Sequence, residues 1–231
     1  ILAIVPARGG SKGIPLKNLK KLGDYSLIAR VGLTVKKIPE IDRVVVSTDN
    51  EKIAKEAEKF GISAPFKRPK SISGDYISDY DVLLHSLKSI EKIDRRKYDI
   101  ILMLQPTSPL RKPLHIKNTL KMLIDNEFDS VWTVSETDSK HHPLKQLIIK
   151  NSMINYYDDE GSNIVARQQL QKTYHRNGIA YAMTRDCIVE QKSIRGKKNG
   201  ALIVNEIHIS IDTYWDLELA EFLLSKINNK T

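Results

Sequence analysis

Short apolar runs alternate with segments of helical periodicity along the first half of the chain, and this alternation limits the fold more than any other feature. The apolar runs cover residues 1–5, 43–47, 98–104 and 130–134, and the helical segments cover residues 26–37, 50–60, 78–93 and 113–126. Strands that alternate with helices form βαβ units with parallel strands. The runs are nearly all apolar, as expected when helices cover both faces. The sequence therefore predicts an α/β fold, a Rossmann-like, mostly parallel sheet with helices on both faces.

The alternation stops after Ser135. Residues 136–175 are polar and hold two short strand-like pieces, 146–150 and 153–157. We interpret this segment as an arm that leaves the core sheet and packs on a partner chain. A strand at 178–183, another near 202–211 and a helix at 214–227 are expected to return to the core. A chain of 231 residues is expected to form one domain, residues 1–231, with the arm at about 136–175 inserted in it.

Composition excludes several classes of protein. Hydrophobic residues make up 41% of the chain, which is enough for a buried core and argues against a disordered chain. No apolar run approaches the roughly 20 residues that span a bilayer, so an integral membrane protein is not expected. Cys187 is the only cysteine, which excludes an internal disulfide. The apolar run at residues 1–5 is too short for a signal peptide, so we expect a cytoplasmic protein.

Positive charge is the first indication of function. The chain has 37 Lys and Arg against 28 Asp and Glu, a net charge of +9, which points to an anionic partner: nucleic acid, an acidic membrane surface or a phosphorylated small molecule. Five of the cations lie together in a stretch without acidic residues before Asp24: Arg8, Lys12, Lys17, Lys20 and Lys21. The remaining cations are scattered over expected helix ends and loops.

The loop at residues 7–18 directly follows the first strand and contains Gly9, Gly10 and Gly13 among these cations. Glycines let backbone N–H groups approach a ligand closely, and successive N–H groups form an anion-binding nest. Together with the fixed positive charge, these features predict a triphosphate site.

The same loop fits a second pattern, G-x-S-x-G, with Ser11 as the nucleophile of a serine hydrolase. That motif needs a helix directly after the serine, whereas Gly13 and Pro15 follow here. The P-loop and dinucleotide-binding glycine motifs are absent. A phosphate site of another kind is therefore favoured, with the hydrolase as an alternative.

Two further segments carry polar groups at expected strand ends. Gln105, in L-Q-P-T-S-P-L-R at residues 104–111, offers a donor and an acceptor to the edge of a base. Asp212, expected to end a strand, can hold Mg²⁺ beside substrate phosphates. The alternative for this second segment is a helix cap, with Asp212 or Thr213 at the N-cap and Asp216 supporting the helix dipole.

Residues 167–181 combine cations, amides and aromatic side chains ahead of a strand. Such a mixture suits a sugar acid, with Arg167 as a bidentate clamp on its carboxylate. The alternative is a solvated loop that turns at Asn177-Gly178.

Over residues 1–224 the chain resembles the cytidylyltransferases that make CMP-activated nonulosonic acids, namely the CMP-N-acetylneuraminate synthetases and their legionaminate and pseudaminate relatives. The motifs that carry this resemblance are I-V-P-A-R-G-G-S-K-G-I-P-L-K-N, V-S-T-D at 46–49, L-Q-P-T-S-P-L-R, and I-D-T-x-x-D-L-x-x-A-E at 211–221. H-H-P-L-K at 141–145, R-Q-Q-L and N-G-x-x-Y are closest to the sialic-acid branch.

The resemblance implies a role for each matching position. Arg8, Ser11 and Lys12 would hold the phosphates of CTP, and Lys17, with Asn18 beside it, would stabilise charge on the α-phosphate. Ser78, Gln105, Pro106 and Thr107 would face the cytosine and ribose. Arg167, Gln168, Asn177 and Tyr181 would contact the sugar acid, and Lys145 would reach the site of the neighbouring subunit in a homodimer. Asp212, with Asp216, would bind Mg²⁺.

The chain departs from this family at three places. Ser210 stands where many members have the first Asp of D-I-D-T, which bears on the metal site. His175 and Arg176 stand where relatives often have Arg and Pro, so that the charge is moved one position along. Gln171 replaces a common Pro, and these last two departures bear on which sugar acid is used.

We therefore expect an enzyme that transfers CMP from CTP to the anomeric hydroxyl of a nonulosonic acid and releases pyrophosphate. Another sugar-acid cytidylyltransferase, such as one for 3-deoxy-manno-octulosonate, is an alternative. A non-enzymatic nucleic-acid-binding module is a further alternative, although aromatic residues make up only 6% of the chain.

Overall fold

The computed structural model describes residues 1–228, whose centre is a six-stranded sheet of order β10-β6-β9-β5-β1-β4. The strands are β1 (Leu2–Pro6), β4 (Arg43–Ser47), β5 (Ile100–Met103), β6 (Ser130–Glu136), β9 (Tyr174–Thr184) and β10 (Asn199–Ile203). β1 pairs in parallel with β4 and β5, and β10 with β6, while β9 runs antiparallel between β5 and β6. The predicted mostly parallel sheet is confirmed.

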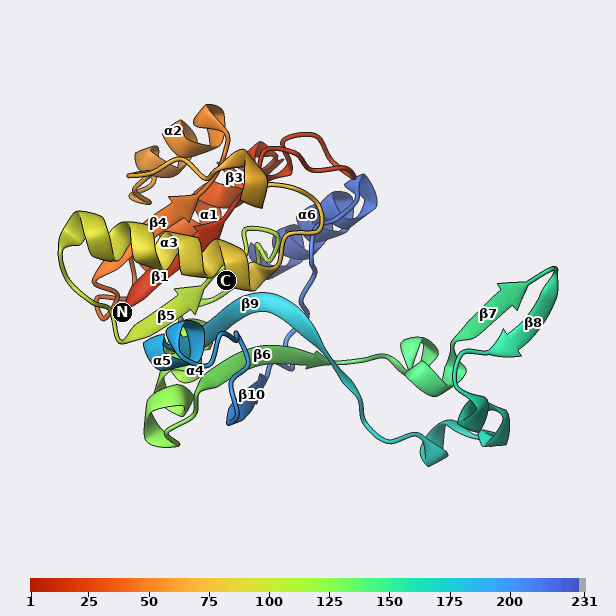
Figure 1. Ribbon diagram of the computed structural model, residues 1–231. Helices are drawn as coiled ribbons and strands as arrows, with labels where there is room; N and C mark the ends of the chain where they lie inside the picture. Colours follow the sequence, from red (N-terminus) through yellow and green to blue (C-terminus); the bar gives the residue numbers. More distant parts are fainter. Residues whose placement is uncertain (229–231) are drawn as a thin grey trace.

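The sheet is covered by helices on both faces, as predicted (Figure 1). The helices are α1 (Leu27–Val35), α2 (Glu51–Lys59), α3 (Asp79–Asp94), α4 (Pro113–Asp125), α5 (Arg185–Val189) and α6 (Tyr214–Asn228). Because successive side chains of a strand point to opposite faces, Ala3 and Val5 pack with α1, α2 and α4, whereas Leu2 and Ile4 pack with α3 and α5. A third cluster joins α6 to the loop after β1 through Ala220.

Local side chains determine where the helices begin. The side-chain oxygens of Ser26, Asn50 and Ser78 accept hydrogen bonds from backbone N–H groups in the first turns of α1, α2 and α3. Pro113 is the first residue of α4, where its missing N–H costs no hydrogen bond. The four predicted helices in this half of the chain are all present.

Three details differ from the sequence predictions. The strand expected near 202–211 ends at Ile203, since Glu206 binds Lys112 and His115 at the start of α4 and draws the chain away from the sheet. Asp212 therefore follows an irregular segment rather than a strand. The strand expected at 178–183 begins earlier, at Tyr174, and the short helix α5 was not predicted.

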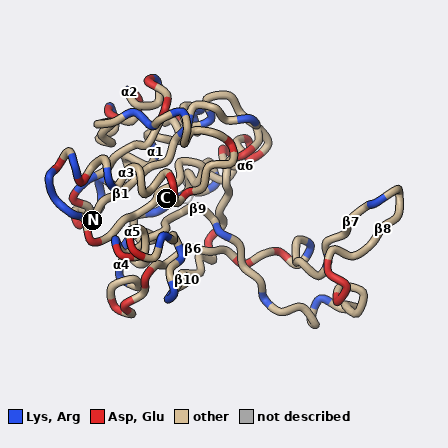
Figure 2. Tube along the Cα trace, in the orientation of Figure 1, with Lys and Arg blue, Asp and Glu red and all other residues tan. Residues whose placement is uncertain are grey.

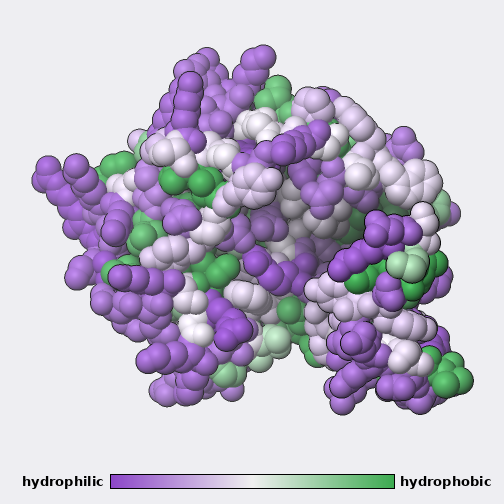
Figure 3. Space-filling model, turned by 45° about the vertical axis from the view of Figure 1, so that its right-hand side comes forward, coloured by the Kyte–Doolittle hydropathy of each residue, from purple (hydrophilic) through white to green (hydrophobic). Residues whose placement is uncertain are grey.

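Residues 137–173 leave the body between β6 and β9 and extend as an arm (Figure 1). The arm carries the antiparallel hairpin of β7 (Leu147–Lys150) and β8 (Met153–Tyr156), together with short 3-10 turns. At its base the N–H of Thr137 donates to the carbonyl of Thr173 at 2.8 Å. Large apolar and aromatic side chains lie exposed on the arm, among them Leu147, Ile149, Met153, Ile154 and Tyr157. Figure 3 shows green, hydrophobic atoms on the surface at its lower right.

The small hairpin of β2 (Lys21–Leu22) and β3 (Tyr25–Ser26) follows the first loop and leads into α1. None of the helices within residues 1–228 is long and apolar enough to cross a membrane.

Candidate active site

A cleft of about 540 Å³ opens beyond the carboxyl ends of β1 and β5. Nine residues proposed from the sequence line it: Arg8, Ser11, Lys12, Lys17, Asn18, Gln105, Pro106, Thr107 and Asp212. Ser78 lies between the lining residues Ile77 and Asp79, where its hydroxyl caps α3 and donates to Asp81 at 2.6 Å. The carboxyl edge of an open α/β sheet is where such folds bind ligands, so the position of the cleft agrees with the predicted site.

The glycine-containing loop after β1 is held against its neighbours by its backbone. The N–H of Gly9 donates to Asp49 at 2.8 Å, and Asn18 donates to the carbonyl of Arg8 at 3.1 Å. A Cβ on Gly13 would overlap the main-chain oxygen of Asp212, so only glycine allows the loop to approach the Asp212 segment so closely. Close backbone contacts thus shape one wall of the cleft.

No helix begins at Ser11, because the loop continues to a short 3-10 helix at Lys17–Leu19. A nucleophile elbow requires a helix directly after the serine. The serine-hydrolase alternative is therefore wrong for this loop.

Carboxylates hold the cations of this loop. Asp75 accepts from Arg8 and Lys12, each at 2.6 Å, and Asp212 accepts from Lys17 at 2.7 Å. The Lys12 and Arg8 partners hold the pKa of the Asp75 carboxyl below its usual range. Arg8 and Lys12 thus share one carboxylate, and Lys17 binds a second one that lines the same cleft, so the charged groups of all three side chains meet anionic oxygens there.

Arg68 is a cleft cation that the sequence analysis missed. Its side chain is buried, and it donates to the hydroxyl of Ser47 at 3.0 Å and to the carbonyl of the same residue. Burial lowers the pKa of this guanidinium to about 10. Arg68 lies in the loop after α2 and does not follow a strand directly. The sequence around it shows an Arg-Pro dipeptide but no pattern that indicates a ligand site.

The carboxylates at residues 212 and 216 have different environments. The Asp212 side chain is 72% exposed and faces the cleft, so an oxygen is available to a cation beside substrate phosphates. Asp216 accepts hydrogen bonds from the N–H groups of Asp212 and Thr213 and from the Thr213 hydroxyl, and Thr213 in return accepts from the N–H of Asp216. Burial raises the pKa of Asp216, but these hydrogen bonds outweigh that effect and leave it lowered. Thr213 thus caps α6, as the alternative prediction allowed, and Asp216 in the first turn supports this cap with its carboxylate.

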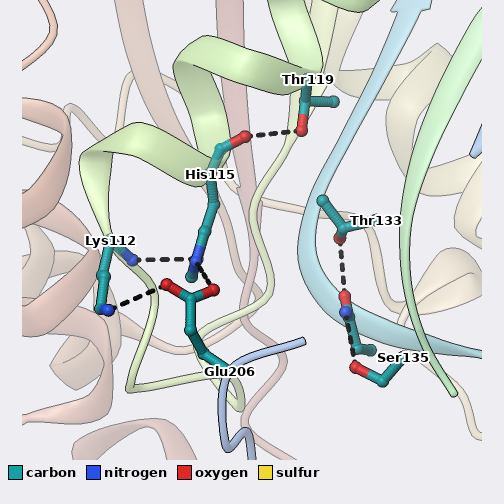
Figure 4. A network of polar contacts seen from close by, with 7 residues as sticks. Lys112, His115, Thr119, Thr133, Ser135 and Glu206 are labelled. Carbon is teal, nitrogen blue, oxygen red and sulfur yellow. Dashed lines mark hydrogen bonds and ion pairs between the residues drawn. The ribbon is translucent and has the colours of Figure 1, made fainter. Parts of the chain in front are cut away.

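A polar network anchors the segment that leads to Asp212 (Figure 4). The Glu206 carboxylate lies 2.9 Å from the Lys112 ammonium and 2.8 Å from Nε2 of His115, at the start of α4. His115 also accepts from the backbone N–H of Lys112 through Nδ1, so Nε2 is the donor to Glu206. Further along, the N–H of Ile211 donates to the carbonyl of Thr107 at 2.8 Å.

Asn177 and Tyr181, both proposed to contact the substrate, are buried beneath the cleft rather than exposed in it. The Asn177 amide accepts from Thr133 at 2.6 Å and donates to Ser135 at 3.1 Å, and these two side chains appear in Figure 4. The Tyr181 hydroxyl accepts from the N–H of Gly178 at 2.6 Å. Since their polar groups are satisfied within the protein, the structure gives both residues a supporting position.

Arg176, one of the departures from the family pattern, connects β9 to α3. Its guanidinium donates to Asp79, a cleft residue, at 2.7 Å and lies 4.8 Å from the ring centroids of Trp132 and Tyr181. The positive charge of Arg176 therefore already has a carboxylate and two aromatic rings as partners within the chain.

The remaining proposed residues belong to the arm and do not reach the cleft within one chain. Arg167 lines a second cavity of about 580 Å³ at the base of the arm, together with Glu136, Asp138 and His142. Gln168 lies beside Arg167 in the same 3-10 turn, and Lys145 ends another turn of the arm. Within one chain, the predicted sugar-acid residues of the arm thus lie apart from the predicted nucleotide residues.

A mostly parallel α/β sheet with a glycine-rich, cationic loop at its carboxyl edge defines a nucleotide-binding enzyme of the nucleotidyltransferase class. A family model described as "Cytidylyltransferase" matches residues 2–228. The chain belongs to the cytidylyltransferase family, and the resemblance seen in the sequence is confirmed.

Individual relatives agree with this assignment. The chain is 30% identical to a pseudaminic acid cytidylyltransferase of Campylobacter jejuni, covering 100% of this chain and 98% of the relative. It is 31% identical to a CMP-N,N'-diacetyllegionaminic acid synthase of Legionella pneumophila, covering 97% and 96%. The solved structure of a CMP:2-keto-3-deoxy-manno-octonic acid synthetase complexed with CTP has a TM-score of 0.72 at 19% identity, covering 97% and 98%, and shows that the fold is shared.

Proposed function

We propose that the protein transfers CMP from CTP to the anomeric hydroxyl of a nonulosonic acid, N-acetylneuraminate or a relative, and releases pyrophosphate. The observation that carries this proposal is that Arg8, Lys12 and Lys17 all bind carboxylate oxygens in the cleft that Gln105 also lines. The named activities of the two relatives above support the acceptor class.

The chain's own residues supply position and charge for this reaction. The acceptor hydroxyl attacks the α-phosphorus in line, a new P–O bond forms, the bond to the β-phosphate oxygen breaks, and the hydroxyl proton passes to solvent. Lys17, whose side chain is only 14% exposed, would stabilise charge that develops on the α-phosphate. Arg8, Ser11 and Lys12 would hold the phosphates that leave, with Asn18 supporting the loop.

The donor set at the cleft fits Mg²⁺ through a single carboxylate. Among residues 1–228 no cluster of three or more metal-binding side chains is present, and Mg²⁺ beside a nucleotide needs only one or two carboxylates with phosphates and water. We assign this role to Asp212, since Asp216 is engaged in the helix cap. Bound Mg²⁺ would neutralise phosphate charge and favour departure of pyrophosphate.

A homodimer would bring the separated halves of the site together. The exposed apolar side chains of the arm are the kind of surface that marks association between proteins. In such a dimer Lys145 of one chain would reach the cleft of the other, and Arg167 and Gln168 would contact the sugar acid. We also propose that this reaction takes place in the cytoplasm.

The charge distribution favours a small anionic ligand over nucleic acid. Figure 2 shows Lys and Arg spread over the body and the arm and interspersed with Asp and Glu. Electrostatic binding of a nucleic acid usually involves a basic patch or stripe on one face. The nucleic-acid-binding alternative therefore has less support than the enzyme.

Pyrophosphate release tests the proposal. The protein is incubated with CTP, Mg²⁺ and one of N-acetylneuraminic, legionaminic or pseudaminic acid, and we expect release that depends on the acid. Release with 3-deoxy-manno-octulosonate alone would favour the alternative transferase. Salt-sensitive binding to random oligonucleotides without any CTP turnover would contradict the proposal.

A further inference from the structure

Arg111, at the end of the Gln105 loop, is a buried cation without a carboxylate partner among its hydrogen bonds. Its side chain is 7% exposed, and burial lowers the pKa of its guanidinium to about 9. The charge is satisfied by three main-chain carbonyls: Nη2 donates to Gln105 at 2.5 Å and to Gly178 at 3.0 Å, and Nε donates to Ile179. A buried charge without a counterion has a high desolvation cost, so its position calls for a specific role.

The two carbonyls that accept from Nη2 belong to Gln105, which lines the cleft, and to Gly178, which lies against the Gln105 side chain. The side-chain oxygen of Gln105 lies 2.5 Å from the point where a Cβ on Gly178 would stand. Gly178 has a φ of +70°, a conformation that favours glycine. One guanidinium nitrogen of Arg111 therefore fixes the main chain of Gln105 relative to the main chain of Gly178.

Gln105 lines the cleft with a side-chain amide, a group that can distinguish bases. Cytosine presents an amino donor and a ring acceptor where uracil presents an acceptor and a ring donor. A side-chain amide offers both functions, and its discrimination depends on a fixed orientation. The Arg111 guanidinium contacts Gln105 at its main-chain carbonyl, not at this side-chain amide.

We infer that Arg111 is a positioning residue that sets the preference for CTP over UTP by holding Gln105 against Gly178. This inference rests on the proposed function, because it requires that Gln105 meets the base. A lysine at the same position keeps the charge but cannot span three carbonyls with a planar fork of donors. The preference for cytosine should therefore depend on the guanidinium and not on the charge alone.

The test measures kcat/KM for CTP and for UTP with a nonulosonic acid and Mg²⁺ in Arg111→Lys and Arg111→Met. The ratio of the two values does not depend on how much of the protein is active, so it separates base preference from folding. We expect the CTP/UTP ratio to fall by about tenfold in Arg111→Met and by less in Arg111→Lys. If Arg111→Met does not fold, the ratio measured with Arg111→Lys still tests the inference.

Ser108→Ala is the matched control. The buried Ser108 hydroxyl donates to the carbonyl of Asn177 at 2.8 Å, and Ser108→Ala removes this bond but keeps the main-chain N–H of residue 108 that donates to the carbonyl of Gln105. The Ser108→Ala variant should have a lower melting temperature but the same CTP/UTP ratio of kcat/KM as the wild type. In a Gln105→Ala background, Arg111→Lys should no longer change the ratio.

The outcomes distinguish a failure of the inference about Arg111 from a failure of the proposed function. A wild-type protein that prefers CTP, beside Arg111 variants with the same ratio and only a lower melting temperature, overturns the inference and leaves the proposed function intact. A wild-type protein that turns over neither nucleotide contradicts the proposed function itself, and the inference with it.

Discussion

The ammonium of Lys17 lies 2.7 Å from Oδ1 of Asp212, although 195 residues separate the two in the chain. Lys17 follows the glycine loop after β1, and Asp212 precedes α6. Their contact closes one side of the cleft and joins the residue proposed to stabilise the α-phosphate with the residue proposed to hold Mg²⁺.

Lys17→Ala should reduce turnover strongly while the fold remains intact. Loss of a preorganised charged donor typically lowers kcat by about 10²- to 10³-fold. Pyrophosphate release measures the activity, and a circular dichroism melt measures the fold. Lys21→Ala, an exposed lysine of β2, is the control and should keep its activity. Near-normal release by Lys17→Ala would refute the role of this residue.

Asp75→Asn should tighten CTP binding several-fold at low salt. The substitution removes a negative charge that binds Arg8 and Lys12 and repels phosphate. The pKa of Asp75 is lowered by these cations, so the wild-type carboxylate stays charged below its usual range and protonates only at lower pH. The difference between wild type and variant should therefore disappear as pH falls through that lowered pKa.

Isothermal titration with CTP across pH and salt measures this effect. Added salt should shrink the difference, because the groups involved are exposed. Weaker binding by Asp75→Asn would show instead that this carboxylate contacts the nucleotide complex directly.

Gly13→Ala should disturb the fold at the cleft, whereas Gly10→Ala should not. A Cβ on Gly13 would overlap the main-chain oxygen of Asp212, while a Cβ on Gly10 meets nothing within 4 Å. Overlap with backbone typically costs about 1–3 kcal/mol, and open surface positions change stability by less than about 0.5 kcal/mol. Urea unfolding of the two variants gives the comparison, and equal midpoints would contradict the predicted close approach.

Glu206→Gln should loosen the segment that carries Asp212. The Glu206 side chain is about half exposed, so the loss of its contacts with Lys112 and His115 should cost only about 0.5–1 kcal/mol. Activity should fall more than stability, since the segment positions Asp212. Glu58→Gln, an exposed position of α2, serves as the control in urea unfolding and pyrophosphate assays. Unchanged activity in Glu206→Gln would separate this network from the site.

Glu91→Gln should destabilise the fold at neutral pH by about 1–2 kcal/mol. Arg185 donates to the Glu91 carboxylate at 2.8 and 3.0 Å and lowers its pKa, with a further contribution from the backbone N–H of Tyr98. A depressed pKa adds stability above the unfolded value near 4.3 that is lost as pH falls through the folded value. Unfolding curves of both proteins should converge in acid, and a gap that persists unchanged to pH 3 would contradict this assignment.

The order of strands and helices could be predicted from the sequence because hydrophobic periodicity and capping are local. The expected run at 43–47 coincides with β4, and the helix expected at 50–60 is present as α2, with Asn50 at its N-cap. The cationic loop was also recognisable, since its glycines and cations lie within a dozen residues.

Other features depended on contacts that no local pattern contains. The antiparallel strand β9 is inserted between β5 and β6, and Asn177 and Tyr181 are buried by that insertion. Arg68, Asp75 and Arg111 enter the site region from loops whose sequence shows no periodicity.

By itself, then, the sequence determined the class of fold and the family, and it predicted the phosphate-binding character of the first loop. Tertiary structure alone decided that Asp75 and Asp212 hold the cations of that loop, that Asp216 supports a helix cap, and that Arg111 supports Gln105. The reason is physical: periodicity and capping arise from neighbours along one element, whereas the partner of a charge is chosen by the packing of elements far apart in the chain.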